Sequence, residues 1–238
     1  MSAAAAGSVE EAPPEAAGEQ TVGVVRREHA GLAVLHAGLS LITVNPLRLG
    51  ESVKHIETEV HPRVQRLTGS LGLSLHVNSD LGLAVLETFW VSDDTLRAGE
   101  RMIAPSKDEA VRRATGTITV EHFAVPVFEQ DAPAATGAGV RMTRIDVPPS
   151  RIEDAIEVFG DTTVPWLADT KGFCRTLYLV DRHSGRTVSE TVWQDARALA
   201  GSRSAAAAIR AEVVSAAGGV IRAVEEYSMV VDTARKPL

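Results

Sequence analysis

The chain has few of the residue types that usually indicate a function. It contains one cysteine, which excludes an intrachain disulfide and a site built from several thiolates. Aromatic residues make up only 4% of the sequence, so each tryptophan or tyrosine is a candidate core anchor or pocket wall. Lysine and arginine form no cluster and the net charge is -7, which argues against binding to nucleic acid or to an acidic membrane.

Long hydrophobic runs are also missing. The apolar stretch at 30–44 is short and is interrupted by His36 and Gly38, so it is not expected to span a membrane. Residues 1–20 are rich in Ala, Gly, Pro and Glu and lack the basic start and apolar segment of a secretory signal. We therefore expect a disordered tail over 1–24 and a soluble, cytoplasmic protein with no membrane partner.

What the chain does contain is one pattern that occurs twice. Residue n of the first half matches residue n+103 of the second without a gap from the forties to the nineties. Identical pairs include Ile42/Ile145, Val44/Val147, Pro46/Pro149, Arg48/Arg151, Pro62/Pro165, Gly69/Gly172, Gly82/Gly185, Glu87/Glu190, Thr88/Thr191, Trp90/Trp193 and Leu96/Leu199. This register predicts two domains, over 25–129 and 139–238, joined by an Ala-, Pro- and Gly-rich linker at 130–138.

Each half has the pattern strand, helix, strand, strand, helix, strand. In the first half, a β-branched run at 38–45 predicts a strand, and an apolar stripe at 53–67 predicts a helix that Pro62 kinks. Alternating residues at 73–77 and an apolar run at 83–91 predict a hairpin. The last strands of the two halves are expected at 117–128 and 220–231.

The second helix is expected to differ between the halves. Pro105 should break it in the first half, and the spacing of Ser106 and Glu109 predicts a capping box that restarts it. Its counterpart at 205–217 contains no proline and should run on without a break.

A unit of this order forms a four-stranded antiparallel sheet with both helices on one face, the ferredoxin-like arrangement. The other face of the sheet is apolar and needs a partner. We therefore predict an α+β fold in which two tandem ferredoxin-like (βαββαβ) repeats pack sheet against sheet into an intramolecular barrel.

The shared residues resemble those of a known family. A proline in the first helix, a glycine seven residues later, Glu-x-x-Trp at the end of the third strand and a leucine six residues on are similar to the antibiotic-biosynthesis-monooxygenase (ABM) family of dimeric α+β barrels. The match covers 38–129 and 139–234. The resemblance implies an oxygenase that acts on a polycyclic aromatic, polyketide-type intermediate of antibiotic biosynthesis, as do the fused ring-opening oxygenases of angucycline-type pathways.

The resemblance also implies cofactors and partners. We expect a small aromatic substrate, O2, no tightly bound cofactor, and reduced flavin (FADH2 or FMNH2) as a diffusible co-substrate from a separate flavin reductase. The chain has no Gly-rich dinucleotide loop, and its seven histidines lack His-x-His or HExxH spacing, so no metal site is predicted. The protein is expected to be either a monomer with an internal pseudo-dimer or a homodimer.

Two alternatives to the oxygenase stay open. The barrel is also suited to bind a hydrophobic small molecule without catalysis. Related folds bind haem through one histidine, which makes a haem-handling barrel the third alternative.

Four residues are candidates for substrate binding. Trp90 and Trp193 each offer a flat wall and one N–H donor, which suits a planar aromatic ligand and equally suits a core anchor. Asn45, at the end of the first strand, and Tyr178, in the second strand of the second half, offer hydrogen bonds.

Two histidines are candidate catalytic bases. His76 lies on the polar face of its strand, and an imidazole there can take a phenolic proton and form the electron-rich phenolate. His55, on the first helix, has Val158 as its counterpart, which indicates a partly buried position. Glu87 and Glu190 recur at one strand position and are expected to have a structural role, such as an ion pair.

The mismatches within the register suggest where function lies. In four pairs the first half has the polar residue and the second half does not, and we therefore expect the active cleft in the first half. These pairs are Asn45/Pro148, His55/Val158, Ser74/Leu177 and His76/Leu179.

Overall fold

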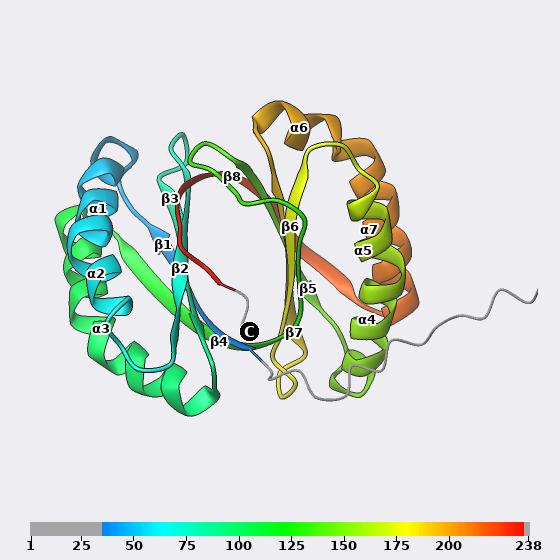
Figure 1. Cartoon of the computed structure of the whole chain (residues 1–238), viewed down its shortest axis with the longest axis horizontal. Coiled ribbons are helices and arrows are strands. Elements are labelled where there is room, and N and C mark those ends of the chain that lie inside the picture. Colours follow the sequence, from blue (N-terminus) through cyan, green and yellow to red (C-terminus); the bar gives the residue numbers. More distant parts are fainter. Residues whose placement is uncertain (1–34, 236–238) are drawn as a thin grey trace, which may run out of the picture. The chain divides into compact units, whose positions relative to one another are not determined.

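Eight strands close into one antiparallel barrel in the computed structural model, which describes residues 35–235 (Figure 1). The order around the barrel is β1-β3-β2-β8-β5-β7-β6-β4. The strands β1 to β4 come from the first half and β5 to β8 from the second, and the halves join where β2 pairs with β8 and β4 with β6. The tail expected over 1–24 lies outside the described residues.

The two halves have the same order of elements, except that two helices of the second half, α6 and α7, take the place of the single helix α3. The first half contains β1 (Leu35–Thr43), α1 (Leu49–His55), α2 (His61–Val64), β2 (Ser70–Asn78), β3 (Leu83–Trp90), α3 (Asp93–Arg113) and β4 (Thr117–Gln130). The second half contains β5 (Gly139–Asp146), α4 (Ile152–Val158), α5 (Val164–Ala168), β6 (Phe173–Val180), β7 (Arg186–Trp193), α6 (Ala196–Gly201), α7 (Arg203–Ala217) and β8 (Val220–Asp232). The predicted hairpins are thus present, and the first strand begins three residues earlier than expected.

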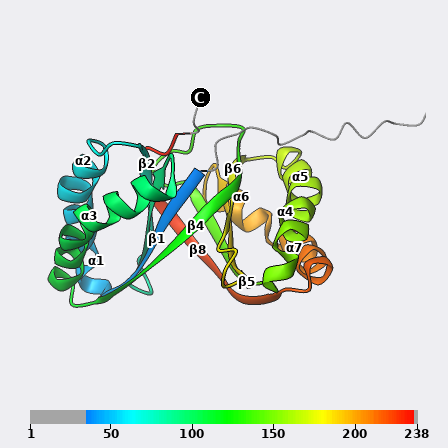
Figure 2. The same ribbon diagram turned by 90° about the horizontal axis from the view of Figure 1, so that it is seen from below.

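The helices cover the outer faces of the barrel wall. Helices α1 to α3 pack on the sheet of the first half, and α4 to α7 pack on the sheet of the second half (Figures 1 and 2). Because strand residues alternate between the two faces, one set faces the helices and the other faces the barrel interior. No helix in the described part of the chain is long and apolar enough to cross a membrane.

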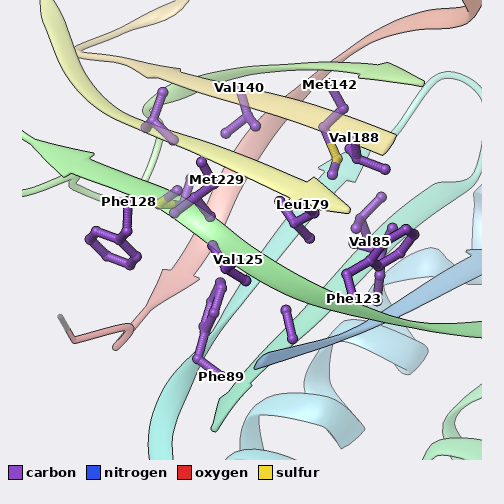
Figure 3. Close-up of a cluster of buried hydrophobic side chains, with 14 of the residues drawn as sticks. Val85, Phe89, Phe123, Val125, Phe128, Val140, Met142, Leu179, Val188 and Met229 are labelled. Atoms are coloured by element: carbon purple, nitrogen blue, oxygen red, sulfur yellow. The ribbon is translucent and has the colours of Figure 1, made fainter. Parts of the chain in front are cut away.

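The barrel interior is an apolar core to which both halves contribute. Phe89 and Phe123 of the first half lie in the same buried cluster as Leu179 and Val188 of the second (Figure 3). Full burial of such a side chain contributes about 1.5–3 kcal/mol. The two sheets therefore share one core, and the helices of each half enclose a separate apolar layer on the outside.

The first helix of each half is irregular at the proline that was expected to kink it. A π-helical turn, Ile56–Val60, follows α1, and α2 begins with Pro62 in its first turn. Proline is tolerated there because the first N–H groups of a helix have no intrahelical partner. The second half repeats this arrangement, with a π-helical turn at Phe159–Thr163 before Pro165.

The prediction for the second helix is wrong in the first half, whereas α7 runs without a break through 205–217 as expected. Helix α3 is continuous through Pro105, which is exposed, and it starts at a capping box formed by Ser92 and Thr95. The break occurs instead in the second half, at Ser202 between α6 and α7. The Ser202 hydroxyl donates to the Leu199 carbonyl oxygen at 2.8 Å, a local bond that competes with regular helix.

Candidate functional site

A cleft lies between the sheet of the second half and its helices. It has an inner cavity of about 50 Å³ and about 600 Å³ of empty space in all, including its open mouth. Strands β5, β6 and β7 form the floor of the cleft. Helices α5 and α7 form the roof, together with the π-helical turn at Phe159–Thr163 that precedes α5. The lining residues are Arg141, Thr143, Ile145, Val147, Phe159, Thr163, Trp166, Tyr178, Ser189, Thr191, Trp193, Ala206, Ile209, Arg210, Val213, Val214 and Ala217.

Aromatic rings give the cleft flat walls. Tyr178 stacks on Phe159 with ring centroids 4.5 Å apart and planes 11° from parallel. Trp166 meets Trp193 edge to face at 6.3 Å. The indole N–H of Trp193 donates to Thr191 Oγ1 at 3.1 Å, which fixes the ring at the end of β7. The walls therefore suit a planar aromatic ligand.

The polar groups of the cleft are few. Burial raises the pKa of Tyr178, so this phenol stays protonated at neutral pH and can donate a hydrogen bond. The guanidinium of Arg141 is already engaged by Glu226, Ser202 Oγ and the Leu199 carbonyl oxygen. No histidine is among the lining residues.

The equivalent space in the first half is filled. Leu86 and Ile103 are fully buried there, at the positions that Ser189 and Ala206 occupy in the second half. Trp90 and Trp193 are both fully buried, but Trp90 packs so tightly against Gly99 of α3 that a Cβ atom at this glycine would overlap the ring. The cleft therefore lies in the second half, although the polar mismatches favoured the first.

The structure brings two of the predicted binding residues together and separates the others. Tyr178 and Trp193 both line the cleft. Trp90 instead donates from Nε1 to Thr88 Oγ1 at 3.0 Å beneath α3. Asn45 caps the short turn after β1, where its side chain accepts from the backbone N–H of Leu47.

The two candidate bases also lie apart from the cleft. His55 is buried under α3, where Nε2 is 3.2 Å from Ser106 Oγ. His76 points to the barrel interior with no exposed surface, because the alternation along β2 turns it away from the helices. Its Nε2 atom lies 3.3 Å from Glu87 Oε2 and 3.2 Å from Glu190 Oε2.

His76 belongs to a buried charged cluster in which both halves take part. Arg175 donates to Glu190 Oε1 at 3.2 Å and forms a bidentate contact with Asp232 at 2.8 and 2.9 Å. Ser74 adds a hydrogen bond to Asp232 at 2.7 Å. Glu87 and Glu190 are thus in ion pairs, in line with the structural role expected for them.

The cluster shifts the pKa values of its members. Burial lowers the pKa of His76, but attraction to Glu190 and Glu87 outweighs burial and raises it to about 9, so the imidazole is protonated at neutral pH. Burial and repulsion by Glu190 raise the pKa of Glu87. Burial acts in the same direction on Glu190, but His76 and Arg175 outweigh it and lower the pKa of that carboxyl. A protonated His76 inside the barrel is poorly placed to take a proton in the cleft.

The same residues are close enough to hold a metal ion, a possibility that their sequence spacing did not suggest. One ligand atom each from His76, Glu87 and Glu190 lies within 4.8 Å of the other two. These groups already form ion pairs with one another and with Arg175.

The fold and the site together define a class of protein: an α+β barrel with an aromatic-lined cleft between sheet and helices. Solved structures share this fold. An anthrone oxidase-like protein has a TM-score of 0.63 at 17% identity, over 84% of this chain and 92% of that chain. A monooxygenase-like protein from Listeria innocua has a TM-score of 0.51 at 10% identity, over 81% and 93% of the two chains. A heme-binding protein from Thermus thermophilus has a TM-score of 0.50 at 10% identity, over 84% and 92%.

Sequence comparison leads to proteins whose role is unknown. The uncharacterized protein Rv2558 of Mycobacterium tuberculosis is 27% identical over 210 residues, which cover 88% of this chain and 89% of that protein. The uncharacterized protein Rv2557 of the same organism is 27% identical over 186 residues, which cover 78% and 83%. No family model matches the chain.

Proposed function

We propose that this protein is an oxygenase that binds a polycyclic aromatic, polyketide-type intermediate in the cleft of the second half and oxidises it with O2. The observation that supports this most directly is that two aromatic pairs, Phe159 with Tyr178 and Trp166 with Trp193, line the cleft. The shared fold of the anthrone oxidase-like and monooxygenase-like proteins supports the same interpretation.

The reaction has two balanced forms. In one, O2 converts an activated ring methylene to a carbonyl and water, and the substrate supplies all four electrons. In the other, reduced flavin supplies two electrons, one oxygen atom enters the substrate and the other leaves as water. We include FADH2 or FMNH2 from a separate flavin reductase as the diffusible co-substrate of the second form.

The side chains of the cleft would bind and orient the substrate. Trp193 and Trp166 would hold the ring system, and the protonated hydroxyl of Tyr178 would donate to a substrate oxygen. The apolar roof residues Val213 and Val214 would keep water from the reacting carbon.

Oxygen uptake tests the proposal. The purified chain is mixed with dithranol, a dihydroxyanthrone, with and without FMNH2 kept reduced, and O2 consumption and product mass are recorded. We expect turnover above the rate of spontaneous oxidation. Replacement Trp193→Phe should lower kcat/KM by about tenfold or more, whereas Trp90→Phe, its counterpart outside the cleft, should leave it nearly unchanged.

A non-catalytic binding protein is the second candidate, and one observation favours it. The cleft contains no histidine or carboxylate to move a proton. In that case the aromatic compound would bind saturably to the cleft without O2 uptake above the spontaneous rate. A haem-handling barrel, the third alternative, would give a Soret band on reconstitution, yet this cleft offers haem no histidine ligand.

We also infer that the two halves are tandem copies of one ferredoxin-like unit, and that the barrel is the intramolecular equivalent of a dimeric one. The 103-residue register and the matching order of strands and helices, in which only α3 is replaced by two helices, support this inference. On the same grounds we propose unit boundaries at 25–129 and 139–238.

A further inference from the structure

The cleft contains a cation that makes no direct ion pair. Arg210 is half-buried on α7 and lines the cleft, but it forms no hydrogen bond or salt bridge with any described residue. Burial lowers the pKa of Arg210 and repulsion by Arg141 acts in the same direction, whereas attraction to Glu226 opposes them without reversing the shift. An arginine placed in this way, beside aromatic walls, favours an anion over a neutral group.

In the first half, the cation at the position equivalent to Arg210 has an acidic partner. The residue that corresponds to Arg210 in the 103-residue register is Lys107, and its Nζ atom pairs with Glu100 and donates to Ser40 Oγ at 3.0 Å. Lys107 and Glu100 are both buried, so the ion pair occupies the space that is a cleft in the second half.

The acidic partner of this pair has been lost in the second half. The counterpart of Glu100 is Arg203, which points outward and pairs with Glu226. Glu226 also accepts from Arg141 at 2.9 Å, so this carboxylate already serves two guanidinium groups. The second half therefore has a cation at the position of Lys107 but no carboxylate at the position of Glu100, and a cleft lies next to the cation.

We propose that the aromatic ligand of this cleft carries an anionic oxygen, a phenolate or a carboxylate, which pairs with Arg210 in the place that Glu100 takes in the first half. The inference rests on the proposed function for the kind of ring system, and it adds the charge of the substrate. The ligand would enter already ionised, which agrees with a cleft that contains no base.

Two ligands of the same shape, one anionic and one neutral, test whether the cleft prefers a negative charge. Anthraquinone-2-carboxylate and anthraquinone-2-carboxamide are titrated into the full chain at pH 7.5 by calorimetry, at low and high salt. We expect the carboxylate to bind at least about tenfold more tightly than the amide at low salt. The difference should shrink as salt rises, because the cleft is open to solvent. Equal affinities, or no binding of either probe, would overturn the inference.

Two variants locate the effect. Arg210→Met should remove the preference for the carboxylate and leave amide binding unchanged. Arg203→Glu restores a carboxylate at the position of Glu100 and should also remove the preference, because Arg210 then has an internal partner. Arg97→Met, which removes one exposed arginine of α3, is the control for net charge. A preference that survives in Arg210→Met contradicts the proposal.

The outcomes separate this inference from the proposed function. Carboxylate preference that depends on Arg210, without O2 uptake, supports an anion-binding cleft and contradicts the oxygenase. Oxygen uptake that is identical in wild type and Arg210→Met supports the oxygenase and contradicts the anionic substrate.

Discussion

Inside the barrel, His76 lies between Glu87 and Glu190, two carboxylates from equivalent positions in the two halves. Arg175 and Asp232 extend this cluster, and the side chains of His76, Arg175 and both glutamates are at most 1% exposed. A buried charge is tolerated only when it has a partner, because removal from water is strongly unfavourable. The stability of the barrel therefore depends on every member of this cluster.

Removal of the imidazole charge should destabilise the chain strongly. In His76→Gln, two buried carboxylates lose their shared cation, and we expect the free energy of unfolding to fall by about 3–5 kcal/mol. Urea denaturation of the wild type and the variant measures this difference. The matched control is His122→Gln, which removes a histidine outside the cluster and should change stability by less than about 0.5 kcal/mol.

The cluster should also make stability depend on pH. The pKa of His76 is raised from 6.5 to about 9 in the folded state, so its contribution is complete below pH 6.5 and is lost as pH rises toward 9. The raised pKa of Glu87 acts in the same direction above pH 4.5, because its ionised form is disfavoured in the folded state. Urea midpoints with EDTA present should therefore decline from pH 6.5 to 9 in wild type and decline less in His76→Gln. A wild-type midpoint that rises over this range would contradict the assignment.

At the scale of elements, Pro105 lies inside a continuous helix. A proline in a helix interior removes one backbone hydrogen bond and clashes with the carbonyl four residues earlier. Pro105 is exposed and lies outside the buried cluster of the first half. The opposite face of α3 packs in that cluster, and this packing keeps the helix continuous in spite of the proline. Its counterpart in α7 is Ala208, also exposed.

Exchanging proline and alanine at these two positions should change the free energy of unfolding in opposite directions. Pro105→Ala should raise the free energy of unfolding by about 1–3 kcal/mol, because it restores helix propensity and the missing bond. Ala208→Pro should lower it by about 3 kcal/mol or more. Thermal and urea unfolding test both variants. Destabilisation in Pro105→Ala would show that the proline has a packing role.

The elements that sequence patterns predicted well are those governed by local rules. Alternation and turn residues located the hairpins, and Pro62 and Pro165 located the irregular first helices. The helix break was missed because it depends on tertiary contacts: Ser202 bonds to its own helix and also accepts from Arg141 on β5. No local sequence signal around Ser202 indicates that contact.

The site was predicted in part for similar reasons. Alternation placed His76 on the face opposite Leu75 but gave no indication that this face meets Glu190 across the barrel. Trp193 and Tyr178 were found because aromatic residues are rare in the chain. Arg210 was missed, although the register carried the signal: Glu100 and Lys107 are of opposite charge, and their counterparts are both arginine.

At the scale of the whole molecule, neither half has a complete core. Each sheet buries one face under its own helices and the other against the opposite sheet. The strands β2 and β4 form the edges of the first sheet, and their free sides are covered by β8 and β6 of the second. A single half would expose an apolar face and two open edges.

Separated halves should therefore not remain monomeric. We expect residues 25–129 expressed alone to form dimers or aggregates, and co-expression with 139–238 to recover a soluble one-to-one complex. Size-exclusion chromatography with light scattering measures both. A stable, folded monomer of either half would contradict the view that the two sheets share one core.

The buried cluster is not symmetric between the two halves. In an assembly of two identical chains, a rotation axis copies every side chain, so a lone imidazole on one side of the axis is forbidden. Here His76 of the first half has Leu179 as its counterpart, and Arg175 of the second half has Gly72. Two halves within one polypeptide are not bound by that constraint. In this chain one half has a closed ion pair, Lys107 with Glu100, and the other has a cleft.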